Sequence, residues 1–164
     1  MIGLNLCPFA RPAYAAGRIR YAVSKATTEQ SLLTDLEREL ETLAEASPEG
    51  IETTLLIHPY VLGDFYEFND FLEIAEAALT ALDLEGIIQV ASFHPHYQFA
   101  GTRPEDIENC SNRSPYPTLH LLREASIERA VAVFPDASQI FERNIETLRR
   151  LGRDGWRRLA VDKA

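Results

Sequence analysis

Two apolar runs in this sequence each end in a histidine that is followed by proline. His58 comes directly after IETTLLI (51–57), and His94 comes directly after IIQVASF (87–93). A strand-end imidazole can serve as a general base, a general acid or a metal ligand. If both runs are parallel strands of one sheet, the imidazoles leave it at the same edge, where open α/β sheets bind ligands. We therefore predict that His58 and His94 form one catalytic site. The alternative is that each ring hydrogen-bonds a loop carbonyl and is structural.

A cysteine near the N-terminus offers a nucleophile. In the segment NLCPF (5–9), the proline is favoured in the first turn of a helix, which puts Cys7 at or beside a helix N-terminus. The helix dipole makes a thiol at that position easier to deprotonate. We predict Cys7 as a catalytic nucleophile with a strand-end histidine as its partner, and Asn5 as a substrate-binding residue. The alternative is that Cys7 is a small buried apolar residue.

The segment NRSPYPT (112–118) carries a further set of binding groups. Arg113 offers a guanidinium fork for a carboxylate or a phosphate, and Asn112 and Ser114 flank it. Tyr97 and Gln98, shortly after the second strand-end histidine, are predicted to line the same mouth. We predict that these five residues bind substrate. The alternative is a rigid, proline-rich segment in which the arginine pairs with a surface acid.

These side chains need a sheet and helices to position them. Residues 18–24 alternate between apolar and polar, as a half-exposed strand does. A helix with a capping-box start at 27–30 follows and ends at SPEG (47–50), and a second helix ends before Gly86. Strands that alternate with helices of this length are typical of parallel crossovers. The sequence therefore predicts an α/β fold with a small, mostly parallel sheet of three or four strands and helices packed on it.

The C-terminal part is predicted to be helical. Residues 95–117 show no periodicity and are predicted to form a long functional loop. After this loop come three predicted helices, with a break at Pro135, at 118–124, 126–133 and 137–151. His120 would lie inside the first of them, as a surface or packing residue.

Composition restricts the class of protein. A chain of 164 residues fits a single domain, 1–164. Its 25 acidic and 16 basic side chains give a net charge of −9, which opposes nucleic-acid binding. We expect a cytoplasmic protein without a membrane partner, because no apolar run approaches the ~20 residues of a membrane span and no secretory leader is visible. The two cysteines lack the spacing of a disulfide scaffold or a zinc site. No glycine-rich phosphate loop is present, so we predict no nucleotide, and the cofactor is unknown.

Three blocks of the sequence resemble a known family. GLNLCPFA (3–10), FHPHYQFAGT (93–102) and NRSPYPTLHLLREASIERAV (112–131) are similar to the bacterial family known as domain of unknown function 1415. The resemblance covers nearly the whole chain and implies no activity. Family members usually carry a further helical segment before the first block, so the resemblance implies that this domain lacks an N-terminal helix. The residues on the family's motif positions are Cys7, His58, His94, Tyr97, Gln98, Asn112 and Arg113.

Three function hypotheses remain open. The first is an enzyme that acts on a small anionic metabolite through Cys/His chemistry at the carboxyl edge of the sheet. The second is a non-catalytic module that binds a ligand or a protein, a second copy of the chain included. The third is a metal-binding protein with Cys7, His58 and His94 as ligands. A pair of His94 and His96 is disfavoured, because the resembling family usually has aspartate at position 96.

Overall fold

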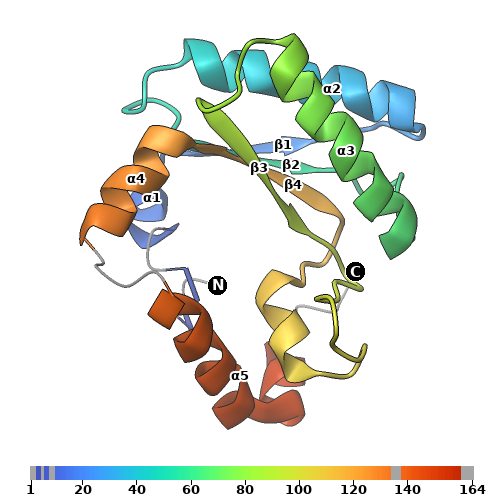
Figure 1. Ribbon diagram of the computed structural model, residues 1–164, viewed down its shortest axis with the longest axis vertical. Coiled ribbons are helices and arrows are strands. Elements are labelled where there is room, and N and C mark those ends of the chain that lie inside the picture. The colour runs from blue at the N-terminus through green and yellow to red at the C-terminus, as the bar shows by residue number, and fades with distance from the viewer. Residues whose placement is uncertain (1–2, 5, 8–9, 134–137, 160–164) are drawn as a thin grey trace.

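The protein is built on one four-stranded sheet (Figure 1). The computed structural model describes residues 3–4, 6–7, 10–133 and 138–159. The strands lie in the order β1-β2-β4-β3, with bounds Ile19–Val23 for β1, Thr53–Ile57 for β2, Ile88–Phe93 for β3 and Thr118–Arg123 for β4. β1 pairs with β2 in parallel, whereas β4 runs antiparallel to both of its neighbours, β2 and β3. The α/β prediction is confirmed, and the prediction of a mostly parallel sheet was wrong.

The error comes from β4, because the sequence analysis assigned 118–124 to a helix. In this segment Leu119 and Leu121 are fully buried in the main core, and His120 between them belongs to the opposite face of the strand. The leucines of TLHLLR also fit one side of a helix, so the pattern was ambiguous. The segment forms a strand because it pairs with a strand on each side, and such tertiary context often outweighs local preference. β1, β2 and β3 still run in one direction, so their carboxyl ends share an edge of the sheet.

Two helices cover one face of this sheet. α2 (Glu29–Glu45) begins at a capping box made by Thr28 and Ser31, one residue later than predicted. α3 (Phe65–Ala81) begins at Asp64, whose carboxylate accepts two backbone N–H groups. The burial of apolar side chains between these helices and the sheet is the main stabilising term. The largest members of this main core are Leu32, Leu36, Leu40, Leu43, Leu56, Phe68, Phe71, Leu79, Ile88, Leu119 and Leu121.

An arginine of the sheet hydrogen-bonds to carbonyl groups at the C-terminal end of α2. Nη2 of Arg123, the last residue of β4, donates to the carbonyl oxygens of Leu43 and Ala46 at 2.5 Å each. Nε of the same side chain donates to the carbonyl oxygen of Ile51 at 3.2 Å. The last carbonyls of a helix have no partner within the helix, and a cation there also interacts favourably with the helix dipole. Arg123 therefore ties α2 to the segment that leads into β2.

The remaining elements lie on the side of the sheet away from α2 and α3 (Figure 1). They are α1 (Ala10–Ala15), the 3-10 helix η1 (Ile107–Asn112), α4 (Glu124–Val133) and α5 (Ser138–Arg158). α5 kinks at Gly152 (φ 65°), where the sequence predicted its end. Four buried side chains make a second core between the N-terminal segment, η1 and α5: Leu6, Cys110, Leu148 and Trp156. The predicted break at Pro135 lies outside the described residues. None of the described helices has the length and apolar character that crossing a bilayer requires.

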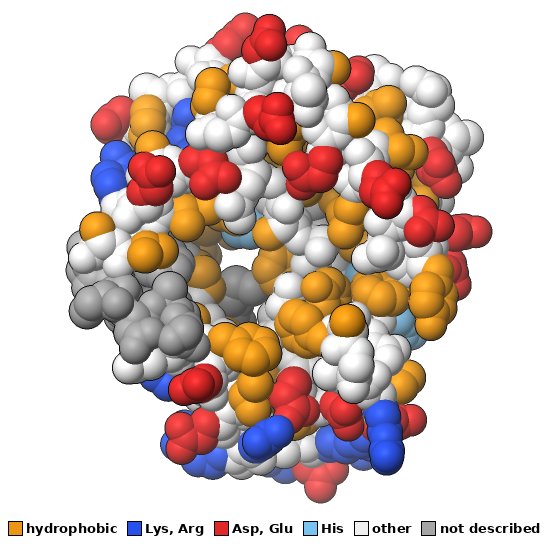
Figure 2. All heavy atoms as spheres, in the orientation of Figure 1, with side chains coloured by type: hydrophobic (Ala, Val, Ile, Leu, Met, Phe, Trp, Pro, Cys, Tyr) orange, Lys and Arg blue, Asp and Glu red, His pale blue; other side chains and the backbone are white. Residues whose placement is uncertain are grey.

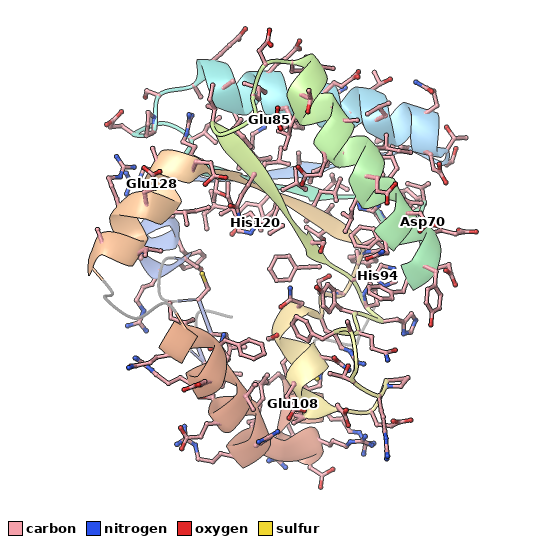
Figure 3. All side chains as sticks on the ribbon, in the orientation of Figure 1. Asp70, Glu85, His94, Glu108, His120 and Glu128 are labelled. Carbon is pink, nitrogen blue, oxygen red and sulfur yellow. The ribbon has the colours of Figure 1, made fainter. Side chains whose placement is uncertain are left out.

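The sheet face opposite α2 and α3, which we call the open face, borders a hollow. Its side chains alternate along each strand with those of the main core: Ile19, Tyr21, Val23, Thr53, Leu55, Ile57, Gln89, Ala91, Phe93, Thr118, His120 and Leu122. Figure 2 shows the hollow between the sheet and α5, with apolar side chains around its mouth. In Figure 3 His120 lies on the hollow side of the sheet. The molecule therefore has one solid half around the main core and one hollowed half.

Candidate functional site

The two strand-end histidines lie close together at one edge of the sheet, where the carboxyl ends of β2 and β3 are found. Both side chains are fully buried. Both rings pack against the ring of Phe68, with centroid distances of 5.7 Å for His58 and 5.1 Å for His94. The structure thus brings these two predicted site residues together at the carboxyl edge of the sheet, with an aromatic ring as their shared neighbour.

The ring nitrogens of this pair face backbone groups. Nε2 of His94 lies 3.2 Å from the carbonyl oxygen of Leu62, and its Nδ1 accepts the backbone N–H of His96 at 3.0 Å. Nδ1 of His58 lies 3.1 Å from the carbonyl oxygen of Val61. Because a carbonyl oxygen only accepts, the ring proton is on Nε2 in His94 and on Nδ1 in His58. The two rings therefore anchor the loop between β2 and α3.

One nitrogen of the pair stays unmatched. Nε2 of His58 is buried and has no hydrogen-bond partner among the residues that the structure describes. Burial lowers the pKa of His58 from 6.5 to about 4 and lowers the pKa of His94 as well. Both rings are therefore neutral at neutral pH. Neither ring is accessible to a substrate in this conformation, because both side chains are fully buried.

Cys7 lies in another part of the molecule. Its carbonyl accepts the N–H of Ala10 at 3.2 Å, so it precedes the first turn of α1. Its neighbour Leu6 packs in the second core, and Asn144 of α5 donates to the Leu6 carbonyl at 2.7 Å. Figure 1 places α1 on the opposite side of the molecule from the carboxyl end of β3. In the described part of the chain, no hydrogen bond joins Cys7 to an imidazole. Asn5, its predicted companion, lies outside the described residues.

The described residues offer no metal centre. No three His, Cys, Asp or Glu side chains among them are placed to hold an ion. The metal-binding hypothesis needed Cys7 beside both strand-end histidines, and the geometry does not support that arrangement. His96 is exposed, with its ring centroid 5.9 Å from that of His94.

Arg113 and Tyr97, two predicted substrate-binding residues, stabilise the long segment before β4. Nε of Arg113 donates to the carbonyl oxygen of Tyr97 at 3.4 Å, and Nη2 donates to that of Pro104 at 2.6 Å. The ring of Tyr97 packs edge-on against Phe65 and Phe99, at centroid distances of 5.4 Å and 5.0 Å. The guanidinium fork that was predicted to hold an anion is thus engaged by two loop carbonyls.

The other predicted binding residues use their polar groups in the same way. Nδ2 of Asn112 donates to the carbonyl oxygen of Ser92 at 3.3 Å. Nε2 of Gln98 donates to the carbonyl oxygen of Thr102 at 2.5 Å, and Oγ of Ser114 donates to a carbonyl two residues later at 2.6 Å. Side chains of segment 95–117 thus hydrogen-bond to backbone carbonyls and stabilise its conformation. We call this segment, which includes η1, the framework.

Sequence reasoning missed the residue at the centre of this framework, Asn109. Its side chain is fully buried, and its Oδ1 accepts from the N–H of Phe99 at 3.0 Å and from the hydroxyl of Thr102 at 2.8 Å. Its Nδ2 donates to the carbonyl oxygen of Arg103 at 2.8 Å. A single sequence gives no signal that separates this asparagine from any other asparagine in a loop.

His120 is the second residue that sequence reasoning misplaced. It lies on β4 instead of a helix, in register with Leu55 on β2 and Ala91 on β3. Its ring centroid is 6.0 Å from that of Phe93. Burial lowers the pKa of His120 to about 4. The alternation of TLHLL was the signal that could have placed this imidazole on the face opposite the core.

Comparison with known proteins gives the family of this chain. A family model described as Protein of unknown function (DUF1415) matches residues 1–158. The chain belongs to this family. No curated protein and no solved structure matches it. The resemblance of the three sequence blocks is therefore confirmed, and the description of the DUF1415 family adds no activity to it.

Proposed function

We propose that this DUF1415 domain is a non-catalytic binding module whose ligand occupies the hollow between the open face and α5. The observation that carries the proposal is the hollow itself, with apolar side chains around its mouth (Figure 2). Its sheet wall is the open face, where Leu55, Ile57, Ala91 and Phe93 are partly exposed. A ligand that covers such a wall gains free energy from each apolar group that it removes from water.

The state of the strand-end histidines favours binding over catalysis. A general base must come within hydrogen-bond reach of the proton that it removes. Both ring nitrogens of His94 have backbone partners, and the unmatched nitrogen of His58 is buried. The predicted enzyme, which would use these residues and Cys7 on a small anionic metabolite, requires a conformational change that exposes the two buried rings.

A thermal-shift experiment tests the binding proposal. The full chain is heated with pools of small metabolites that include apolar, neutral and anionic compounds. We expect at least one compound to raise the melting temperature, because a ligand of the folded state stabilises it by mass action. Ala91→Leu, which fills space on the open face, should abolish this shift. Ala77→Leu, the same substitution at an exposed position of α3, should keep it.

Two outcomes would reject the proposal. One is that no compound raises the melting temperature of the unchanged chain. The other is that Ala91→Leu keeps the full shift, which would put the bound compound outside the hollow. Loss of the shift in Cys7→Ala or His94→Ala, with Ala91→Leu unaffected, would favour the enzyme hypothesis instead.

A second candidate is assembly of two copies through the edge of the sheet. β1 is an edge strand, and its side chains Tyr21 and Val23 are 57% and 63% exposed on the open face. An edge strand carries unpaired backbone groups that can pair with a strand of another chain. Sedimentation should then show a dimer that Val23→Lys dissociates. A mass of one chain at every concentration would reject this candidate.

We also propose a cytoplasmic location and no nucleic-acid partner. Cys7 and Cys110 form no disulfide, as expected in a reducing compartment. The net charge of −9 opposes contact with phosphate backbones. Fractionation of cells that produce the tagged chain tests the location.

A further inference from the structure

A hydrogen-bond relay fixes the proton of His120 on the open face. Nε2 of His120 lies 2.7 Å from Oγ1 of Thr53, and that hydroxyl donates to the carbonyl oxygen of Leu121 at 2.6 Å. A hydroxyl has one proton to donate, so Oγ1 must accept from the imidazole, and Nε2 carries the ring proton. Nδ1 of His120 is therefore a lone-pair acceptor.

This acceptor is unpartnered in the described part of the chain and is not fully buried. Nδ1 of His120 has no hydrogen-bond partner among the described residues. The atom keeps some exposed surface, since it does not belong to the fully buried, unpartnered polar atoms. Figure 3 shows His120 on the hollow side of the sheet. Since the pKa of His120 is lowered to about 4, the ring is neutral and keeps this lone pair at neutral pH. Nε2 of His58, by contrast, is buried.

The surroundings of the acceptor are apolar. Leu55 and Ala91 flank His120 on the neighbouring strands, and the ring of Phe93 lies at 6.0 Å. A ligand that covers this wall removes Nδ1 from contact with solvent. An apolar ligand without a donor leaves the nitrogen unsatisfied, whereas a ligand with a donor replaces the lost hydrogen bond.

We propose that the hollow selects an apolar molecule that carries one O–H or N–H group, and that Nδ1 of His120 accepts a hydrogen bond from that group. The proposal rests on the proposed binding function and specifies its ligand class. A carboxylate is disfavoured, because at neutral pH it only accepts hydrogen bonds and would face a lone pair. The predicted small anionic metabolite therefore does not match this wall.

Three naphthalenes of similar size test the proposal. 2-Naphthol donates one hydrogen bond, 2-methoxynaphthalene donates none, and 2-naphthoate is an anion. By titration calorimetry on the full chain at neutral pH, we expect 2-naphthol to bind about fivefold more tightly than its methyl ether. We expect 2-naphthoate to bind more weakly than both. His120→Phe should remove the difference between naphthol and ether, and His96→Phe, the same change at an exposed position, should preserve it.

A spectroscopic measurement on the unchanged chain does not depend on how any variant folds. The nitrogen-15 resonance of an unprotonated imidazole nitrogen shifts when that nitrogen accepts a hydrogen bond. We expect the Nδ1 resonance of His120 to shift on addition of 2-naphthol and to stay in place with 2-methoxynaphthalene.

The outcomes separate this inference from the proposed function. Equal affinities for naphthol and ether, or an Nδ1 resonance that naphthol leaves unchanged, would overturn the acceptor role and leave the hollow as a binding site. Tighter binding of 2-naphthoate would overturn the predicted ligand class. If none of the three compounds and no pooled metabolite binds, the proposed function fails together with the inference.

Discussion

The two faces of the sheet carry histidines of different kinds. On the covered side, His58 and His94 are fully buried against Phe68, and their ring nitrogens face the loop between β2 and α3. On the open face, His120 donates from one ring nitrogen to Thr53, and its other ring nitrogen is unpartnered among the described residues and not fully buried. The first arrangement uses imidazoles to build structure, and the second leaves a hydrogen-bond acceptor available.

The direction of a pKa shift does not distinguish these two arrangements. Burial lowers the pKa of His58 and of His120 to about 4 in both cases. A perturbed pKa is a common mark of functional sites, but close packing in a core produces the same shift. What differs is whether a lone pair can be reached by a ligand. The assignment of function therefore depends on hydrogen-bond geometry and not on titration.

The largest expected effect comes from removing the ring that both strand-end imidazoles contact. Phe68→Ala should lower the free energy of unfolding by about 4 kcal/mol, because it empties a fully buried site at the centre of the covered face. Urea unfolding followed by circular dichroism measures this. Tyr66→Ala, at a position on α3 that is 74% exposed, should cost about 0.5 kcal/mol or less. Similar losses in the two variants would mean that the covered face is not the core of the protein.

The second effect is on the pH dependence of stability. The pKa of His58 is lower in the folded state (about 4) than its ordinary value of 6.5, so the unfolded chain binds more protons between these values. The contribution of His58 to the free energy of unfolding is therefore fully present above pH 6.5 and is lost as the pH falls toward 4. For this histidine the loss amounts to about 3 kcal/mol by the lower end of the window.

A matched variant isolates this contribution. His58→Gln keeps a donor for the carbonyl of Val61 and removes the titrating group. The free energy of unfolding of the unchanged chain should fall by about 3 kcal/mol more than that of the variant between neutral pH and pH 4. The carboxylates contribute equally to both proteins and cancel in the difference. Parallel pH profiles would show that His58 is solvated in the folded protein.

The third effect concerns the arginine that ties the covered side together. Arg123→Met keeps much of the apolar stem and leaves the last carbonyls of α2 without a donor, so it should cost about 2 kcal/mol. Arg129→Met, on the exposed side of α4, should cost about 0.5 kcal/mol or less in the same unfolding experiment. An equal cost would mean that water replaces Arg123 at the end of α2.

The sequence predicted the parts of this fold that local patterns determine. The strands at 18–24, 51–57 and 87–93 and the capped helix that follows Thr28 have one dominant periodicity each, and the structure has elements there. TLHLLR was assigned wrongly because its leucines fit both a helix and a strand. Its place between β2 and β3 depends on pairing partners that are 61 to 69 residues away for β2 and 25 to 35 residues away for β3, as the register Ile57↔Thr118, Thr53↔Leu122, Phe93↔Thr118 and Ile88↔Arg123 shows.

The candidate site was predictable to a smaller degree. Strand direction brings His58 and His94 to one edge, and that followed from the pattern of strands and helices. The hydrogen bonds of Arg113, Asn112 and Gln98 to backbone carbonyls did not follow, because residue type does not determine whether a polar group faces a ligand or the protein backbone. The hollow was not predictable either, since it arises from how α5 lies relative to the sheet (Figure 2).

The smallest expected effect tests whether the open face is uncovered in solution. Val23 and Val90 are valines on opposite faces of the sheet: the first is 63% exposed, and the second packs against the main core. Replacing each with threonine preserves shape and adds one hydroxyl. Val90→Thr should cost about 1.5 kcal/mol, because the hydroxyl enters an apolar environment, and Val23→Thr should cost about 0.3 kcal/mol or less. Urea unfolding at several protein concentrations measures both. A larger cost for Val23→Thr that grows with protein concentration would show that a second copy covers this face, because only then would the added hydroxyl be buried.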